Sequence, residues 1–316
     1  MTTQPLVSII CLCYNHERFL QEALDSVLAQ TYQNIEVIVV DDCSTDGSMA
    51  IIEANLQKHP QLKFISTGHN RGNCTAFNIG LQASLGEYII DFATDDVLLP
   101  ERVAQQVATF QKLDKSYGIV YSDAEYISDD SEHLYYHSQK YKPAPNGDVF
   151  SEVLRRYFIC SPTMMVRRSV FDFLGGYDEN LYYEDFDFWV RSARKYKYHY
   201  MAEVTTRRRI HSSSMSSKWY SKGDRHLASH VLILEKALEL IQTPEEKAAM
   251  ITRLKYEVRQ TYFSGNFKQA AQMLLLLHQV LPNLPAPYRC MELLNKYKVN
   301  LSVLRKLYYR LRYRNP

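Results

Sequence analysis

Short apolar runs alternate with amphipathic stretches along the first hundred residues of the chain. Strands are predicted at four of these runs, Val7–Cys13, Ile35–Val40, Leu62–Ser66 and Tyr88–Phe92. Between them, apolar residues recur at helical spacing and predict helices, and Pro100 lies where a first-turn proline would open the next helix. The alternation of strand and helix predicts an α/β domain built on a mostly parallel sheet flanked by helices.

The apolar pattern becomes less regular farther along the chain. Strands are predicted at Ile119–Tyr126, Thr163–Val166 and Tyr196–Val204, and an amphipathic helix at Glu184–Lys195. The polar, tyrosine-rich stretch Ser128–Asp148 is predicted to be a loop. Its length and its aromatic content make it a candidate substrate wall or lid.

The strand pattern ends near Gly223, and helical periodicity follows. We place a boundary there, between an α/β domain of residues 1–222 and a helical C-terminal domain of residues 223–316. Three helices are predicted in the second domain, at His226–Ile241, from a capping box at Thr243–Glu246 to Phe263, and from the turn after Gly265 to Leu281.

The composition is that of a folded protein. Of the 316 residues, 46% are hydrophobic and 23% are charged, which excludes disorder over most of the length. The longest apolar runs fall short of the roughly 18 to 20 residues that a membrane-spanning helix needs. Because Met1–Pro5 has no basic cluster, we expect no secretory signal, a cytoplasmic location and reduced cysteines.

The net charge of +2 conceals a basic C-terminal segment. Between Arg289 and Arg314, eight basic residues accompany one acidic residue, a balance of +7 that leaves −5 for the rest of the chain. Residues 301–314 fit two interpretations. They form either a basic amphipathic helix on an anionic membrane surface, at the inner face of the cell membrane, or a terminal helix packed on the preceding helices. Nucleic acid is not expected, because no recognition motif accompanies the charge.

Two pairs of acidic residues, Asp41–Asp42 and Asp95–Asp96, follow predicted strands. In open α/β sheets, ligands bind outside the carboxyl ends of the strands. A single acid at such a position is more often a cap or a turn former. Four carboxylates at one rim repel one another unless cations or hydrogen-bond donors offset them, so the two pairs indicate a divalent metal, a nucleotide, or both.

Five motifs, in order along the chain, carry a resemblance to a known family. They are Val7–Ile10 with Tyr14–Asn15, Val37–Asp42, Asn70–Gly72 with Ala76, Asn78 and Gly80, Thr94–Asp96, and Glu184–Asp185. Over roughly residues 5–215 they resemble the GT-A domain of inverting family 2 glycosyltransferases of the bacterial surface-polysaccharide type. The resemblance implies transfer of a hexosyl or N-acetylhexosaminyl group from a nucleotide diphosphate sugar, with UDP-sugar favoured, to a hydroxyl of a glycan or lipid-linked acceptor.

The resemblance assigns the nucleotide to residues at the ends of the first strands. Tyr14 would stack on the base, because a flat aromatic side chain offers contact area at little entropic cost, and the alternative is a tyrosine that closes the edge of the core. Asp42 would accept the imide N–H of the base, and Asp41 would shape the turn or reach the ribose. Asn70 and Arg71 would lie near the base or the diphosphate, although a solvated loop arginine also fits.

The Thr94–Asp96 motif stands where the family has its DxD element. The resemblance gives Asp95 to the ribose and Asp96 to a Mn²⁺ or Mg²⁺ ion that also binds both phosphates. A hard cation on the phosphate oxygens offsets the charge of the departing diphosphate. His211 resembles the histidine that closes over the diphosphate as metal ligand or hydrogen-bond donor, and a plain surface histidine is the alternative.

The resemblance also supplies the catalytic base. Direct displacement requires a carboxylate that takes the proton of the acceptor hydroxyl, and we choose Asp185, with Glu184 as its rival and Asp187 next. Acids at this position also simply favour the amino end of a helix. Arg207–Arg209 either clamp phosphate or form a basic strand end that faces solvent.

One departure from the family pattern affects the base pocket. Leu12–Cys13 stand where many relatives have a proline before the Tyr14–Asn15 pair.

Two other functions share the architecture: a catalytically inactive nucleotide-sugar-binding or membrane-scaffold protein, and a nucleotidyltransferase. The latter would need a glycine-rich, basic loop after the first strand, where this chain has Cys11–His16 without glycine.

Overall fold

The computed structural model describes residues 4–211 and 219–303. The chain forms two compact units, each described by itself here. The first comprises the residues up to 149 together with 157–211, and the second comprises 150–156 and the residues after 211. Segment 150–156 thus belongs to the helical unit although strands of the first unit flank it in sequence, which the prediction of one boundary near Gly223 did not include.

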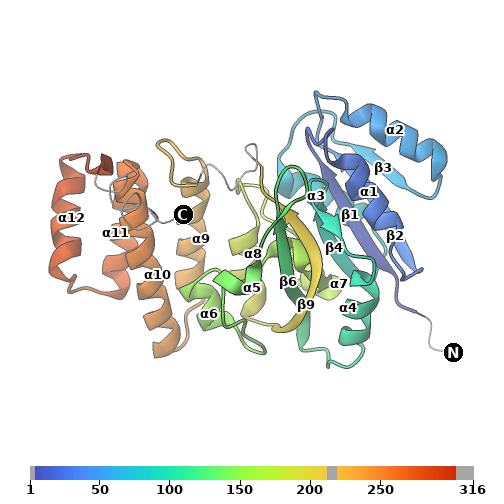
Figure 1. Cartoon of the computed structure of the whole chain (residues 1–316). Helices are drawn as coiled ribbons and strands as arrows, with labels where there is room; N and C mark the ends of the chain where they lie inside the picture. Colours follow the sequence, from blue (N-terminus) through green and yellow to red (C-terminus); the bar gives the residue numbers. More distant parts are fainter. Residues whose placement is uncertain (1–3, 212–218, 304–316) are drawn as a thin grey trace. The chain divides into compact units, whose positions relative to one another are not determined.

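The first unit is an α/β structure (Figure 1). Its strands are β1 (Val7–Cys13), β2 (Ile35–Asp41), β3 (Lys63–Ser66), β4 (Tyr88–Ala93), β5 (Val97–Leu98), β6 (Tyr117–Ile127), β7 (His133–Tyr136), β8 (Met165–Arg167) and β9 (Lys197–Arg209). Its helices are α1 (Leu20–Leu28), α2 (Ser48–Lys58), α3 (Asn73–Ala83), α4 (Arg102–Phe110), α5 (His137–Lys140), α7 (Arg168–Leu174) and α8 (Asp185–Ala193), with a 3₁₀ turn at Ser161–Thr163.

The strands form one sheet in the order β3-β2-β1-β4-β8-β6-β9-β5, and β7 pairs with β6. Strands β3, β2, β1 and β4 are parallel to one another, and β6 is parallel to β9. Because β8 is antiparallel to both β4 and β6, the strands β6 and β9 run in the same direction as β1. The predicted α/β architecture with a mostly parallel sheet is confirmed, and the carboxyl ends of β1, β2, β4, β6 and β9 lie at one edge of the sheet.

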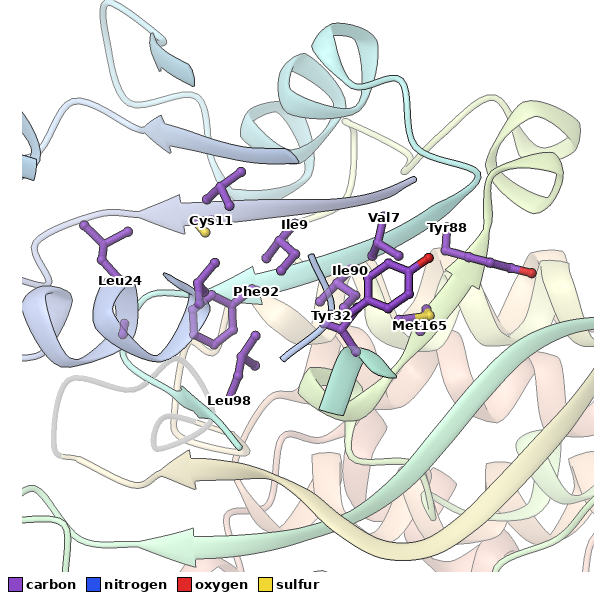
Figure 2. Packing of buried hydrophobic residues seen from close by; sticks show 14 of the residues in the cluster. Val7, Ile9, Cys11, Leu24, Tyr32, Tyr88, Ile90, Phe92, Leu98 and Met165 are labelled. Carbon is purple, nitrogen blue, oxygen red and sulfur yellow. The ribbon is translucent and has the colours of Figure 1, made fainter. Parts of the chain in front are cut away.

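One face of the sheet is packed by apolar side chains of the flanking helices. All seven residues of β1 are buried, as predicted for a strand covered on both faces. Leu20, Leu24 and Val27 recur at helical spacing on α1 and join the core that contains Ile9 and Phe92 (Figure 2). Each such side chain stabilises the fold by roughly 1.5 to 3 kcal/mol when fully buried.

Helix α3 contacts β1 and β2 and approaches the sheet very closely at Gly80. A Cβ atom at this position would lie 2.5 Å from the Ile10 side chain and 3.1 Å from that of Val40. Glycine therefore lets the α3 backbone rest against the strands. Because Asn73 is the first residue of α3, this contact also positions the loop that precedes the helix.

Four sequence predictions about the first unit were wrong in part. Segment Ser128–Asp148 is not only a loop, because it contains β7 and α5, with β7 paired to β6. Strand β9 continues past Val204 to Arg209, since its backbone stays paired with β6 as far as Ile127. Pro100 precedes α4 rather than opening it, and the strand predicted at Thr163–Val166 begins two residues later.

The second unit is helical. It contains α6 (Phe150–Arg155), α9 (His226–Glu239), α10 (Pro244–Phe263), α11 (Phe267–Val280) and α12 (Ala286–Lys296). The three predicted helices and the capping box between Thr243 and Glu246 are confirmed, whereas α12 was not predicted. The buried Arg253 of α10 donates to the carbonyl oxygens of Val153 and Leu154, which explains why α6 belongs to this unit.

Most of the basic segment 301–314 lies outside the described residues, so both interpretations of it stay predictions. Within 4–211 and 219–303, none of the helices combines the length and the apolar character needed to cross a membrane.

Candidate active site

Asp41 and Asp42 occupy the carboxyl end of β2 and have different partners. The Asp41 carboxylate is buried and accepts hydrogen bonds from the backbone N–H (3.0 Å) and the hydroxyl (2.5 Å) of Ser44. The Asp42 N–H donates to the Cys13 carbonyl at 2.8 Å, which joins the ends of β1 and β2. Of the two roles predicted for Asp41, the structure therefore shows the one in the turn.

The Asp42 carboxylate binds the loop that contains Asn70 and Arg71. It accepts the backbone N–H groups of Arg71 and Gly72, both at 2.8 Å, and the Thr67 hydroxyl at 2.9 Å. The side chains of Asn70 and Arg71 are exposed. Sequence motifs that lie about thirty positions apart are thus brought together at the edge of the sheet, as predicted, by a carboxylate and backbone N–H groups.

Tyr14 follows β1 and has 44% of its surface exposed, so it does not close the edge of the core. Its neighbour Asn15 has a positive φ of 56° and fixes the local backbone. The Asn15 side-chain oxygen accepts a hydrogen bond from the Thr45 backbone N–H at 2.7 Å. The backbone N–H of Asn15 donates to the Ser44 hydroxyl at 2.9 Å. The aromatic ring therefore stands on a loop that is tied to the turn after β2.

Asp95 and His211 form a pair. His211 is buried, so it is not a plain surface histidine, and its Nε2 lies 2.9 Å from Asp95 Oδ2. Burial favours the protonated acid, but the hydrogen bond from His211 and the charges of His16 and His211 together outweigh it and lower the pKa of Asp95. Because Nε2 faces Asp95, contact of this atom with a metal ion would require the hydrogen bond to open.

Asp96 is buried beside this pair. Its Oδ1 accepts the backbone N–H of Arg209 at 2.8 Å, and 3% of the residue is exposed. Burial, and next the charge of Asp95, raise the pKa of Asp96 well above its ordinary value. Among the described residues, no group of three or more histidine, cysteine or acidic side chains is arranged to hold a metal ion, so any ion here would take further ligands from the substrate or from water.

His16 belongs to the same cluster, and the sequence analysis missed it. Its Nδ1 lies 2.8 Å from the Thr94 hydroxyl, which itself donates to the Leu12 carbonyl at 2.9 Å. The hydroxyl proton is thereby used, so Nδ1 carries the hydrogen of this bond and Nε2 is the acceptor nitrogen. Burial lowers the pKa of His16, which favours the neutral ring. The only signal in the sequence is its place directly after Tyr14 and Asn15.

The three consecutive arginines of β9 have separate environments. Arg207 pairs with Glu125 at 2.9 Å, and 43% of its side chain is exposed. Arg209 is buried and binds Glu22 at 2.6 Å and the carbonyl oxygens of Asp95 and Ser128, both at 3.0 Å. Arg208 points to the opposite face, as alternation along a strand requires, and donates to the Tyr126 hydroxyl at 2.9 Å.

Arg208 connects the two acids on which the site depends. Asp185 is the first residue of α8, and Glu184 immediately precedes the helix. Burial raises the pKa of both Asp96 and Asp185. The positive charge of Arg208 lowers both pKa values and so offsets part of this rise. The charge of Arg208 on β9 therefore reaches an acid in the turn after β4 and an acid at the start of α8, so Asp96 and Asp185 lie in the same part of the unit.

Comparison with known proteins agrees with this geometry. Residues 8–175 match the family described as "Glycosyl transferase family 2". The chain belongs to this family. An uncharacterized glycosyltransferase of Rickettsia typhi is 33% identical over 219 residues, which cover 68% of this chain and 67% of that protein. The matched part covers 36% of a relative from Rickettsia felis, so the chain spans about two thirds or less of the length of these relatives.

Solved structures show the same fold. Staphylococcus aureus TarS 1–349, in complex with UDP-GlcNAc, superimposes with a TM-score of 0.69 at 18% identity, over 92% of this chain and 87% of that one. The mannosyltransferase PcManGT of Pyrobaculum calidifontis, in complex with GDP-Man and Mn²⁺, gives a TM-score of 0.58 at 20% identity, over 94% and 86%. This chain is a glycosyltransferase with the GT-A fold.

Three carboxyls at the start of α8 are the candidates that the sequence analysis named for a catalytic base. Asp187 is buried and forms an ion pair with Arg191 at 2.7 Å, and Arg191 also binds the carbonyl oxygens of Leu174 and Gly176, so this pair holds the preceding turn. Burial, and next the charges of Asp185 and Asp91, raise the pKa of Glu184 to about 8. A protonated Glu184 cannot accept a proton at neutral pH, which favours Asp185.

Asp91 is a second residue that the sequence analysis missed. It lies on β4 and accepts a hydrogen bond from the Tyr177 hydroxyl at 3.0 Å. Burial raises its pKa to about 7, and the charge of Asp185 also raises it. An acid inside an otherwise apolar strand was the available signal. Asp91 and Glu184 together place two weakly ionised carboxyls next to Asp185.

Proposed function

We propose that this transferase moves a sugar, with inversion, from a nucleotide diphosphate sugar to a hydroxyl of a glycan or lipid-linked acceptor. A UDP-sugar is the favoured donor. The observation that carries the proposal is that the charge of one guanidinium, that of Arg208, acts on both Asp96 and Asp185. The complexes of TarS with UDP-GlcNAc and of PcManGT with GDP-Man support a donor of this class.

The nucleotide would lie at the ends of β1, β2 and β4. The exposed ring of Tyr14 offers a stacking face for the base. Asp42 holds the Asn70–Arg71 loop through backbone N–H groups and keeps oxygen lone pairs for the imide N–H of the base. Asp95, oriented by His211, would accept from the ribose hydroxyls.

The residues around Asp96 fit a divalent cation, Mn²⁺ or Mg²⁺. Two adjacent acids, one of them buried with a raised pKa, form a site that a cation would stabilise in its ionised form. Asp96 would be the carboxylate ligand, and His211 a ligand or hydrogen-bond donor once it leaves Asp95. A bound ion would supply positive charge for the diphosphate oxygens. PcManGT holds Mn²⁺ together with its donor, which supports this assignment.

Asp185 would act as the general base. It takes the proton of the acceptor hydroxyl while the hydroxyl oxygen forms its bond to the anomeric carbon. The bond from that carbon to the diphosphate oxygen breaks at the same time, and the diphosphate leaves with the electron pair. Arg208 helps to keep Asp185 ionised and offers N–H groups to the departing diphosphate, the role that the sequence analysis considered for all three arginines.

A screen of nucleotide sugars tests the proposal. Thermal unfolding of the full chain is measured with UDP-, dTDP- and GDP-sugars, with Mn²⁺ and with a chelator in its place. A ligand that binds the native state raises the melting temperature, and we expect a UDP-sugar to do so only with the metal present. Release of UDP in the presence of the selected donor then measures turnover. No stabilisation by any of these donors would contradict the proposed function.

A further inference from the structure

A row of hydrogen bonds leads from the interior of the first unit to Arg208. His137 Nε2 lies 2.9 Å from the Phe158 carbonyl oxygen, and His137 Nδ1 lies 3.2 Å from the Tyr126 hydroxyl. The same hydroxyl accepts Nη1–H of Arg208 at 2.9 Å. Tyr126 and Arg208 are cross-strand partners in the register of β6 and β9, so the sheet itself sets their alignment.

Chemistry fixes the direction of each hydrogen bond. A carbonyl oxygen only accepts, so the hydrogen of His137 must be on Nε2. In the neutral ring Nδ1 is then an acceptor, and the Tyr126 hydroxyl donates to it. The hydroxyl oxygen keeps its lone pairs for Arg208. Burial lowers the pKa of His137, which preserves the neutral ring on which this direction depends.

Ring packing holds the members of this row in place. Tyr126 and His137 are 5% and 6% exposed. The Tyr126 ring stacks on Tyr135 with a centroid distance of 4.5 Å and an interplanar angle of 15°. The His137 ring lies between Tyr126 (6.0 Å, 9°) and Tyr141 (4.5 Å, 22°). Neither the phenol nor the imidazole can turn away from Arg208 without breaking this stack.

We propose that Tyr126 and His137 are positioning residues for donor binding. They fix the position of the Arg208 guanidinium, whose charge acts on both Asp96 and Asp185, and leave its other N–H groups available to the diphosphate oxygens. The proposal rests on the proposed function. A guanidinium carries five N–H donors, and Tyr126 takes one of them, so the remaining donors can bind an anion. It also gives the segment Ser128–Asp148 a role: through His137 of α5, that segment supports the donor site.

The variant Tyr126→Phe isolates the hydroxyl, because phenylalanine keeps the ring in the stack. An arginine without a fixed hydrogen-bond partner must be ordered when the anion binds, which costs affinity. We expect the Kd for UDP, measured calorimetrically with Mn²⁺, to rise about tenfold. Binding of uridine, which has no phosphate, should not change and can be followed by ligand-observed NMR.

Two control variants separate positioning from general damage to the fold. Tyr135→Phe removes a hydroxyl from the same ring stack, and the described residues show no hydrogen bond of that hydroxyl, so UDP binding should stay as in the wild type. In an Arg208→Gln background, Tyr126→Phe should have no further effect, because the residue that it positions is gone. Should Tyr126→Phe fail to fold, His137→Phe keeps an aromatic ring and removes both hydrogen bonds, and it should weaken UDP binding likewise.

The outcomes distinguish the inference from the function on which it rests. If the wild type binds UDP and Tyr126→Phe binds it with the same Kd, the positioning role is overturned and the proposed function stays intact. Equal losses for UDP and uridine, or an additive loss in the Arg208→Gln background, would also overturn it, since they indicate a merely structural role. If the wild type bound none of UDP, GDP and dTDP with Mn²⁺, the proposed function itself would be contradicted.

Discussion

Replacing Glu184 by glutamine tests how charge is distributed around the proposed base. Burial is the main cause that raises the pKa of Glu184 to about 8, and the neighbouring Asp185 and Asp91 add to it. Near neutral pH the folded protein therefore holds a proton on this side chain. Glutamine has nearly the same shape as the protonated acid and cannot ionise, so Glu184→Gln keeps the packing and removes the titration.

The effect on stability follows from the direction of this pKa shift. In the unfolded chain the side chain ionises near its ordinary pKa of 4.5, whereas in the folded chain it stays protonated to about pH 8. Between these values the folded state binds more protons, so wild-type stability falls as pH rises, by at most about 1.4 kcal/mol per pH unit. Over the whole window the loss is at most about 5 kcal/mol, because Asp91 and Asp185 share the proton.

Urea unfolding measures this difference. Fluorescence of Trp189 in a Trp219→Phe background reports on the first unit, and the exposed Glu132→Gln serves as the matched control. We expect Glu184→Gln to match the background protein below about pH 4.5, to become more stable through the window, and to keep a constant advantage above about pH 8. Sugar transfer should persist, because the proposed base is Asp185. Identical unfolding curves at about pH 8, or an advantage that is largest in acid, would refute the reasoning.

Three further predictions concern other parts of the chain. Glu257 of α10 is buried; His230 (3.1 Å), Arg253 (3.4 Å) and the Tyr220 hydroxyl (2.6 Å) surround it. Burial alone would raise its pKa, but His230 first and then Arg253 lower it to about 2. The ionised Glu257 therefore stabilises the fold above about pH 4.5, and this contribution is lost as pH falls toward 2. Glu257→Gln should destabilise the helical unit by about 3 to 5 kcal/mol in urea at neutral pH. Full stability in that variant would contradict the role of this network. Gly80→Ala should cost about 1 to 3 kcal/mol by the same assay, because the added methyl meets Ile10, and an unchanged midpoint would show that α3 shifts freely. Deletion of residues 301–316 should abolish flotation with anionic liposomes if that segment binds membranes, whereas unchanged binding, or none in the full chain, would leave the packed-helix interpretation.

The sequence predicted those parts of the fold that depend on local pattern. Strands β1, β2 and β4 are continuous, mostly buried apolar runs. This distinguishes them from α1, in which apolar residues recur at helical spacing. The capping box at Thr243–Glu246 is likewise local. The two aspartate pairs lie at the same edge of the sheet as expected, because the parallel strands β2 and β4 end there.

The sequence could not separate the roles of residues whose partners are distant. Arg207, Arg208 and Arg209 look equivalent in sequence, and their different environments come from Glu125, Tyr126 and Glu22, which lie on other elements. Segment 150–156 resembles part of the first domain until Arg253, about a hundred positions later, binds its carbonyl groups.

The two sites that sequence reasoning missed have the same explanation. Asp91 belongs to the candidate site because it interacts with Tyr177 and Asp185. His16 belongs to it because it interacts with Thr94 and with the Asp95–His211 pair. Neither residue stands in a motif that marks it as functional. Long-range packing, which periodicity does not encode, brings these groups together.

The paired variants Asp185→Asn and Asp96→Asn test most directly whether one site uses these two carboxylates for different tasks. Binding of UDP with Mn²⁺ is measured by calorimetry, and turnover by UDP release with the donor that the thermal screen selects. We predict that Asp185→Asn binds UDP like the wild type while turnover falls by about 10² to 10⁴, and that Asp96→Asn loses the part of UDP binding that depends on Mn²⁺. Wild-type turnover in Asp185→Asn, or metal-dependent UDP binding that survives in Asp96→Asn, would contradict the account.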